Sequence, residues 1–267
     1  MHAISSAVAN HPCFSQEAHS RCGRIHLPVA PACNLDCAYC ERVFDCANES
    51  RPGVTSRVLT PDEAVVRMER ALAIYPAIRV AGIAGPGEPL YNEETFATLA
   101  LLRERFPAVQ SCVGTNGLLL ADRVDDLARY GVKTITVTVN TLKGATASRI
   151  YGWKGGAADM LLKRQREGLA CAVRRHLAVK LNMVLIPGVN LDEAEEVAGF
   201  AAEAGVFLMN VIPLIPCGKM SEISAPTDIQ LFQARTAAAR HISQFTHCRR
   251  CRADAVGIPG KEAITFL

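Results

Sequence analysis

The sequence predicts an α/β protein whose core is a partial (β/α)6 barrel of the TIM type, open on one side. Two observations predict this fold. Apolar segments alternate six times with segments of helical pattern between residues 25 and 212, as a parallel sheet requires. The apolar segments are also rich in Ala, Val and Ile, as expected for strands that are covered on both faces.

Each element follows from a local pattern. The six expected strands are short, apolar and in part β-branched, and they occupy residues 25–30, 78–84, 109–113, 134–139, 177–185 and 206–212. The first expected helix begins at Thr60-Pro61-Asp62-Glu63, which supplies an N-cap, a proline at the first helical position and acidic residues in the first turn. The other expected helices lie between the strands, at residues 93–105, 121–130, 143–151, 157–174 and 192–204.

A chain of 267 residues, of which 49% are hydrophobic, can bury one large core, so one compact domain is expected. Within it we distinguish three segments. An irregular N-terminal arm occupies residues 1–24, the barrel occupies residues 25–215, and a C-terminal tail occupies residues 216–267. We expect the arm and the tail to lie over the open side of the barrel.

The composition argues against several classes of function. The net charge of +3 is spread along the chain without a long run of Lys or Arg, so no nucleic-acid partner is expected. No apolar stretch approaches the roughly 20 residues of a membrane span, and the start of the chain lacks the pattern of a signal peptide. We therefore expect a soluble, cytoplasmic protein without a membrane partner.

The 11 cysteines are the outlying feature of the composition. A reducing cytoplasm disfavours disulfides, so metal ligation is the better explanation. Cys33, Cys37 and Cys40 have the spacing C-x3-C-x2-C in the loop after the first expected strand. Three thiolates suit a [4Fe–4S] cluster and leave its fourth iron free to bind a cofactor. The alternative is a zinc knuckle, which would need a fourth ligand at short spacing.

Further polar residues follow the expected strands. Glu88 follows the second strand, Asn116 the third, Asn140 the fourth and Asn190 the fifth. Functional residues of parallel βα barrels gather at the carboxyl ends of the strands. We therefore expect one rim to unite the cysteine loop with a carboxylate and several amides.

The cysteine motif, with the aromatic Tyr39 before its last cysteine, resembles that of the radical S-adenosylmethionine (SAM) superfamily. The resemblance implies that SAM chelates the open iron and is split by one electron into methionine and a 5′-deoxyadenosyl radical. It also implies a place near the adenine for Tyr39, near the methionyl amino group for Glu88, and near the ribose and adenine for Asn140. The residues expected to bind the cofactor are Tyr39, Gly85, Gly87, Glu88, Asn116, Asn140, Ile186 and Gly188.

More narrowly, residues 11–257 resemble the NifB family of nitrogenase cofactor maturases. The stretches that carry this resemblance include His11-Pro12-Cys13-Phe14-Ser15, Asp45-Cys46-Ala47-Asn48-Glu49 and His247-Cys248-Arg249-Arg250-Cys251. The resemblance implies three [4Fe–4S] clusters, two of them auxiliary, which are fused with a SAM-derived carbide and an added sulfur into an eight-iron core. It also implies an Fe–S donor, an electron donor and a carrier or scaffold protein as partners. Many members continue into a carrier-like domain, so the end at Leu267 predicts handover to a separate protein.

Soft ligands from both ends of the chain are expected to hold the auxiliary clusters. They are Cys13, His19, Cys46, Cys248 and Cys251. Cys112 is either a further ligand or a core residue, and even with it the ligands are too few to saturate two clusters that must later be released. From the residues alone, Cys13, His19, Cys248 and Cys251 suit a Cys3His zinc site as well. His11 is expected to cap the backbone or face solvent, the role of His247 stays open, and the isolated Cys171 and Cys217 are typical of small buried residues.

Two other functions remain open. A radical SAM enzyme with auxiliary clusters that modifies a peptide or small molecule would need a substrate-recognition module, and the sequence shows none. A non-catalytic Fe–S carrier would not need the SAM-binding loops around Glu88 and Asn140.

Overall fold

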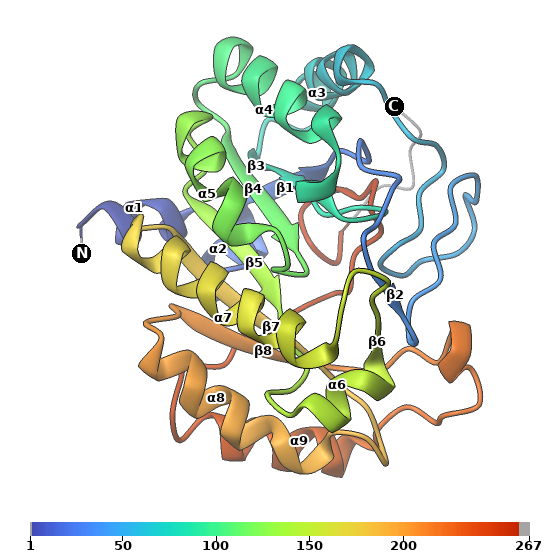
Figure 1. Ribbon diagram of the computed structural model, residues 1–267. Coiled ribbons are helices and arrows are strands. Elements are labelled where there is room, and N and C mark those ends of the chain that lie inside the picture. The colour runs from blue at the N-terminus through green and yellow to red at the C-terminus, as the bar shows by residue number, and fades with distance from the viewer. Residues whose placement is uncertain (1, 262–267) are drawn as a thin grey trace.

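The computed structural model describes residues 2–261, and Met1 and residues 262–267, at the ends of the predicted arm and tail, lie outside the described part. Its centre is a curled sheet of seven strands in the order β8-β7-β5-β4-β3-β1-β9 (Figure 1). Neighbouring strands from β1 to β8 are parallel, so the predicted half-barrel is confirmed. The six predicted strands correspond to β1 (Gly23–His26), β3 (Ile78–Ile83), β4 (Gln110–Thr115), β5 (Thr134–Thr138), β7 (Ala178–Leu185) and β8 (Leu208–Pro213). The first of them lies earlier than predicted, because β1 ends at His26 and not at residue 30.

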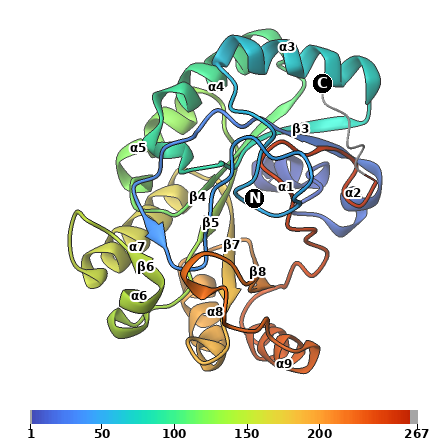
Figure 2. The same cartoon turned by 90° about the vertical axis from the view of Figure 1, so that its right-hand side faces the viewer.

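The predicted helices cover the outer face of this sheet, and Figure 2 shows them as an arc around it. The first begins as predicted, because Thr60 and Glu63 form a capping box in which each side chain accepts a hydrogen bond from the backbone N–H of the other. The predicted helices are α3 (Pro61–Ile74), α4 (Glu93–Arg105), α5 (Leu120–Arg129), α6 (Gly144–Ile150), α7 (Ala158–Arg174) and α8 (Ala194–Glu203). Single 3-10 turns are η1 (Pro89–Tyr91), η2 (Leu191–Glu193) and η3 (Gly218–Met220).

The arm and the tail contain regular structure that was not predicted. The arm, expected to be irregular, forms α1 (His2–Ala9) and α2 (Gln16–Arg21), so that expectation was wrong. The second of these helices is capped by Ser15, whose hydroxyl accepts a hydrogen bond from the Ala18 N–H at 3.2 Å. The other unpredicted elements are α9 (Asp228–Ala238), β9 (Val256–Gly257), and the short pair of β2 (Asp36–Cys37) with β6 (Tyr151–Gly152).

The tail reaches both edges of the sheet. At one edge, the Phe245 N–H donates a hydrogen bond to the Met209 carbonyl of β8 at 2.7 Å. At the other edge, β9 pairs antiparallel with β1. The arm lies on the same side of the sheet as the tail (Figure 2), and its Phe14 packs with Phe245 of the tail and Leu208 of β8 in a small apolar cluster. The arm and the tail therefore cover the open side of the half-barrel, as predicted.

The inner face of the sheet differs from the outer face. Residues that point outward, such as Ile135 and Val179, are buried in the large core beneath the helices. Residues that alternate with them point inward and are mostly small or polar. Several keep partial exposure in the middle of the sheet: His26, Gly114, Thr136, Thr138 and Asn182. The half-barrel thus presents a polar, partly accessible inner face to the arm and the tail.

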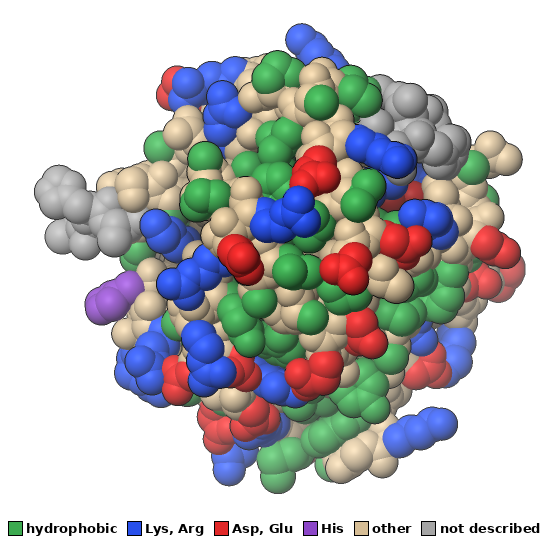
Figure 3. Space-filling model, turned by 90° about the horizontal axis from the view of Figure 1, so that it is seen from above, with side chains coloured by type: hydrophobic (Ala, Val, Ile, Leu, Met, Phe, Trp, Pro, Cys, Tyr) green, Lys and Arg blue, Asp and Glu red, His purple; other side chains and the backbone are tan. Residues whose placement is uncertain are grey.

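Two observations describe the helices and the surface charge. No helix in the described part of the chain is long and apolar enough to cross a membrane. Acidic and basic side chains are interspersed on the face that Figure 3 shows, in keeping with the low net charge of +3.

Candidate cluster and cofactor sites

The cysteine triad lies on the loop between β1 and α3. This loop is anchored on the rim, because β2, which contains Cys37, pairs with β6, and the Ala38 N–H donates to the Ile150 carbonyl at 2.8 Å. All three thiols are partly buried. Burial raises the pKa of Cys37, and the neighbouring Cys40 and Cys33 raise it further. The three thiols therefore lie close together, and burial disfavours their thiolate forms.

Two residues outside the motif lie beside the triad. Burial raises the pKa of Cys40 to about 11, and the Arg42 guanidinium opposes this effect and favours the thiolate. Cys217, predicted to be isolated and buried, is partly exposed, and its Sγ donates a weak hydrogen bond to the Tyr39 carbonyl at 3.4 Å. Its charged form would also raise the pKa of Cys40, so the two thiols are neighbours. Cys217 is 178 residues from Tyr39 along the chain, which is why no local pattern indicated this proximity.

Gly87 is the point at which the cysteine loop crosses the loop after β3. Its N–H donates to the Ala30 carbonyl at 2.6 Å, and the next N–H, that of Glu88, donates to the Ala32 carbonyl at 2.9 Å. A Cβ atom at Gly87 would lie 2.2 Å from the Ala32 carbonyl oxygen. Only glycine fits here, because the two backbones approach more closely than any side chain allows. Gly85, two residues earlier, has a φ of +137° that also favours glycine.

Glu88 joins the carboxyl ends of two strands. Its side chain is 3% exposed, and its carboxylate accepts hydrogen bonds from the Thr115 hydroxyl at 2.5 Å and from the Asn116 and Leu90 N–H groups at 2.7 and 3.1 Å. Burial raises the pKa of Glu88 to about 7, although these hydrogen bonds favour the carboxylate. Asn116 in turn donates from Nδ2 to Asn34 Oδ1 at 2.8 Å, so the chain of contacts reaches the cysteine loop.

Asn140 is a buried residue whose side chain and backbone form four hydrogen bonds, one of them to Tyr39. Its Nδ2 donates to the Tyr39 hydroxyl at 3.1 Å, and its Oδ1 accepts from the Val184 N–H at 2.8 Å. Its backbone N–H donates to the Tyr151 hydroxyl at 2.9 Å, and its carbonyl accepts from Asn190 Nδ2 at 2.8 Å. The side chain of Asn140 is fully buried and its polar atoms are used within the protein. It therefore positions the predicted adenine-side aromatic.

The two remaining predicted cofactor residues, Ile186 and Gly188, lie in different environments. Ile186 is fully buried and belongs to the apolar cluster against which Cys33, Cys37 and Tyr39 pack. Gly188 is exposed, has a φ of +71°, and its carbonyl accepts a hydrogen bond from the Arg149 side chain of α6 at 2.9 Å. The rim thus unites most of the predicted set, with Gly188 on its outer side.

A second group of thiols lies at the inner face, beneath the arm and the tail. Cys112 of β4 is buried in the same apolar cluster as Phe14, and Cys13 and Cys248 pack against this cluster. Burial raises the pKa of Cys251, and Cys13 and Cys248 raise it further, so Cys251 lies near both. The structure therefore brings together four of the predicted ligand cysteines, from the arm, β4 and the tail.

Imidazoles border this second group. The His19 Nδ1 lies 2.7 Å from the Pro12 carbonyl, which can only accept, so Nδ1 carries the proton. His19 Nε2 is then left as a bare acceptor, and it is buried without a hydrogen-bond partner among the described residues. A backbone carbonyl that fixes Nδ1 while Nε2 stays available is the usual arrangement of a metal-binding histidine. The His247 ring centroid lies 5.8 Å from that of His19, at the edge of the same group.

His11 and His26 were not predicted as ligands, and both face this group. His11 caps the backbone as expected, since its Nδ1 accepts from the Cys13 N–H at 3.1 Å, but it does not face solvent because it is 2% exposed. Its Nε2 is buried and has no hydrogen-bond partner among residues 2–261. His26 Nδ1 donates to the Arg252 carbonyl at 2.8 Å, and burial lowers the pKa of His26 to about 4. Because His11 Nδ1 accepts, the proton of His11 lies on Nε2, which is a donor in this tautomer. The bare, buried Nε2 of His19 is therefore the imidazole nitrogen of this group that fits a cluster ligand.

Cys46 lies near the tail but apart from the other thiols. Its Sγ accepts a weak hydrogen bond from the Glu49 N–H at 3.4 Å, and its carbonyl accepts from the Arg252 side chain at 2.8 Å. Arg252 also pairs with Asp254 at 2.8 Å, and Asp254 accepts from the Ser56 N–H at 2.7 Å. This network ties the tail to the cysteine loop.

The described part of the chain holds no three His, Cys, Asp or Glu side chains that converge on a single-ion site.

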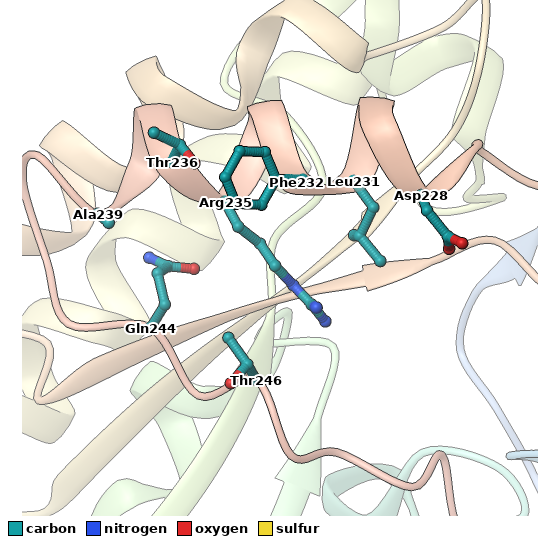
Figure 4. A pocket seen from close by; sticks show the side chains of 8 residues that line it. All are labelled: Asp228, Leu231, Phe232, Arg235, Thr236, Ala239, Gln244 and Thr246. Carbon is teal, nitrogen blue, oxygen red and sulfur yellow. The ribbon is translucent and has the colours of Figure 1, made fainter.

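A pocket of about 530 Å³ lies beside α9 (Figure 4). It is lined by Leu231 and Phe232 of α9 and by Gln244 and Thr246 of the tail. Arg235, which also lines it, donates from Nε to the Val211 carbonyl at 3.0 Å, and its pKa responds to Cys248. The pocket therefore borders the second group of thiols at the β8 edge of the sheet, and no sequence pattern indicated it.

Comparison with known proteins assigns the class. Residues 27–201 match the family model of the radical SAM superfamily. The fold is similar to that of a radical SAM methyltransferase from Sphaerobacter thermophilus, with a TM-score of 0.55 and 24% identity, over 84% of this chain and 64% of that one. The half-barrel and the triad are thus those of a radical SAM protein, a class that implies a [4Fe–4S] cluster and SAM as cofactors.

Two relatives assign the family. The chain is 42% identical to the FeMo cofactor biosynthesis protein NifB of Klebsiella pneumoniae, over 97% of this chain and 59% of that protein. It is also 42% identical to the protein of the same name from Methanocaldococcus infernus, over 97% of this chain and 88% of that protein. The chain belongs to the NifB family. It spans somewhat more than half the length of the Klebsiella relative and most of the length of the Methanocaldococcus one.

Proposed function

We propose that this chain is a radical SAM enzyme that fuses two [4Fe–4S] clusters, with a SAM-derived carbide and an added sulfur, into the eight-iron precursor of the nitrogenase cofactor. The observation that carries the proposal is the presence of two separate groups of thiols in one half-barrel. One group lies on the rim loop, and the other lies at the inner face among the arm, β4 and the tail. The names of the relatives, which are cofactor biosynthesis proteins, support the same reading.

At the rim, the residues of this chain bind and orient. When bound, the cluster and SAM supply one-electron cleavage of a carbon–sulfur bond and a methyl group. The Cys33, Cys37 and Cys40 thiols lose their protons to become cluster ligands, and the Arg42 guanidinium stabilises the resulting charge. Asn140 holds the Tyr39 ring in place on the adenine side. The Glu88 carboxylate uses three of its roughly four acceptor positions to hold Leu90, Thr115 and Asn116, which leaves one for the methionyl amino group.

At the inner face, the residues of this chain hold the substrate clusters. The predicted ligands are five thiols and His19, whereas two [4Fe–4S] clusters contain about eight irons. Partial ligation leaves iron corners free, which suits clusters that must merge with each other and then leave. The bare Nε2 of His19 supports its place in this set, and Cys46 would have to approach from the loop near Arg252.

The proposed partners follow from this chemistry. A low-potential electron donor must reduce the rim cluster, an Fe–S donor must load the inner face, and a carrier or scaffold protein must accept the product. The pocket beside α9 and the partly accessible inner face border the second group of thiols and are the places we propose for access of these partners.

Iron counting and EPR on anaerobically purified protein test the proposal. We expect about twelve irons per chain, four for each of three clusters. About four irons together with zinc would instead identify the second group as a structural metal site. Failure to cleave SAM under reducing conditions would remove the enzymatic function and leave an Fe–S carrier.

Three variants separate the two groups of thiols. Cys40→Ala should abolish SAM cleavage, whereas Cys248→Ala should preserve deoxyadenosine production and stop formation of the eight-iron precursor. Cys171→Ala is the matched control, because Cys171 lies on α7, away from both groups of thiols, and its sulfur accepts from Arg174 at 3.0 Å. Equal loss of both activities in the first two variants would contradict this division of labour.

A further inference from the structure

Lys180 is a buried cation at the centre of the inner face. It lies on β7, where its register partner is Leu208 of β8, and it is 5% exposed. Its Nζ donates a hydrogen bond to the Cys13 carbonyl at 3.2 Å. The Phe14 and Phe245 ring centroids lie 5.3 and 5.4 Å from Nζ. The ammonium is thus enclosed by the arm on one side and the tail on the other.

Lys180 has no carboxylate partner in the described part of the chain. Its ammonium forms none of the ion pairs found there, which lie mainly at the surface. Asp254, a buried carboxylate of the tail, is already paired with Arg252. A buried ammonium without a counter-charge is costly, and two aromatic faces and one carbonyl compensate for only part of the lost hydration. The site therefore requires an anion.

Two of the predicted cluster ligands and two histidines that were not predicted as ligands surround Lys180. The positive charge of Lys180 acts on the thiols of Cys13 and Cys112 and on the imidazoles of His11 and His26. A second buried cation, Arg24 of β1, donates to Cys251 Sγ at 2.9 Å and to the Gly257 carbonyl at 2.7 Å. The thiols are neutral when protonated, so they supply the missing negative charge only when they bind metal. A [4Fe–4S] core with three thiolate ligands is a net anion.

We propose that Lys180 is the counter-charge of the Fe–S cluster bound at the inner face, and that it stabilises the reduced form of that cluster. The inference rests on the proposed function, because it requires a cluster at the second group of thiols. Reduction adds one electron from an external one-electron donor and breaks no bond, so the cluster becomes one unit more negative beside a fixed ammonium. A nearby positive charge favours the more negative state. Lys180 suits this role because it lies on a strand of the sheet, whereas Cys13 and Cys248 lie on the arm and the tail.

The test is an EPR-monitored redox titration with dithionite on anaerobically purified protein. The background carries Cys33→Ala, Cys37→Ala and Cys40→Ala, so that only clusters at the inner face contribute signals. In this background, Lys180→Met should disfavour the reduced cluster at least tenfold at a fixed potential, which is a negative shift of about 59 mV for one electron. Lys133→Met is the matched control, because Lys133 is exposed just before β5, and it should leave the potential unchanged.

The outcomes separate the inference from the proposed function. If the triad-free background itself contains no iron–sulfur signal, the proposed function fails. If Lys180→Met keeps its iron and its potential matches that of the control, Lys180 is not the counter-charge and the inference is overturned. If Lys180→Met loses its iron, the variant Lys180→Arg is measured next. Retention of iron at the native potential in Lys180→Arg supports the need for a positive charge at this position. Loss of iron in Lys180→Arg as well overturns the inference.

Discussion

Replacement of Asp254 by Asn should weaken the attachment of the tail to the cysteine loop. The Asp254 carboxylate accepts hydrogen bonds from the Arg252 side chain at 2.8 and 2.9 Å, and from the Ser56 N–H and hydroxyl at 2.7 and 2.9 Å. It is 8% exposed and lies three residues after Cys251. This one side chain therefore connects the tail ligands to the loop that carries the triad.

The expected loss of folding stability follows from the pKa of Asp254. Burial alone would raise this pKa, but the hydrogen bonds and charge of Arg252 and the hydrogen bonds of Ser56 outweigh burial and lower it from 3.8 to about 2. A lowering of nearly two units corresponds to about 2 kcal/mol of stability. Because the folded-state pKa is depressed, this stability is fully present above about pH 4 and is lost as the pH falls towards 2. Asp254→Asn lacks this contribution to stability at every pH, so its difference from the wild type is largest where the wild type has the contribution in full.

Urea unfolding of the reduced, metal-free protein measures this difference. At pH 7 we expect Asp254→Asn to be less stable than the wild type by at least about 2 kcal/mol, since the variant also leaves Arg252 without its charge partner. The gap should narrow between pH 4 and pH 2. Asp125→Asn is the control, because Asp125 pairs with Arg175 at the surface, where such pairs contribute about 1 kcal/mol or less. A gap that is absent at pH 7, or that stays constant down to pH 2, would refute the reasoning.

Two further predictions concern the rim. Gly87→Ala places a Cβ atom 2.2 Å from the Ala32 carbonyl oxygen, so the cysteine loop must move. We expect this variant to lose the rim cluster and with it about a third of the iron bound by the wild type. Normal SAM cleavage by the variant would contradict the close approach of the two loops at Gly87. Glu88 has a pKa raised to about 7, so its ionisation should cost the folded state about 3 kcal/mol as the pH rises from 4.5 to 7. In Glu88→Gln, the free energy of unfolding measured in urea should no longer fall between pH 4.5 and 7, whatever the pH-independent cost of the substitution. An unchanged fall would show that Glu88 is not the group that titrates.

The local patterns of the chain were sufficient for much of the fold. The capping box at Thr60 and Glu63 and the β-branched run at 134–139 each lie within a few residues, and the structure has the helix and the strand where they were expected. The arm was mispredicted because its helices are only eight and six residues long. Helices this short are marginal by themselves and depend on packing that the sequence does not display.

The rim site was also accessible from the sequence, since its chemistry is compact. Cys33, Cys37 and Cys40 lie within one loop, and their spacing alone indicates an Fe–S ligand set. The sequence also placed Glu88 and Asn140 at strand ends, but it could not show that their polar atoms are satisfied inside the protein. These contacts add a positioning role for Glu88 and Asn140, and their contact with the cofactor stays a prediction.

By itself, the sequence determined the class of fold, the triad and the set of soft ligands, because periodicity and motif spacing are local properties of the chain. Only the tertiary structure decided which distant residues meet: Cys13 with Cys251, Cys217 with the triad, and Lys180 with the ligands of arm and tail. The physical reason is that sheet register and the path of the tail between β8 and β1 set these distances. Neither is encoded in any short segment, since each depends on the packing of the whole half-barrel.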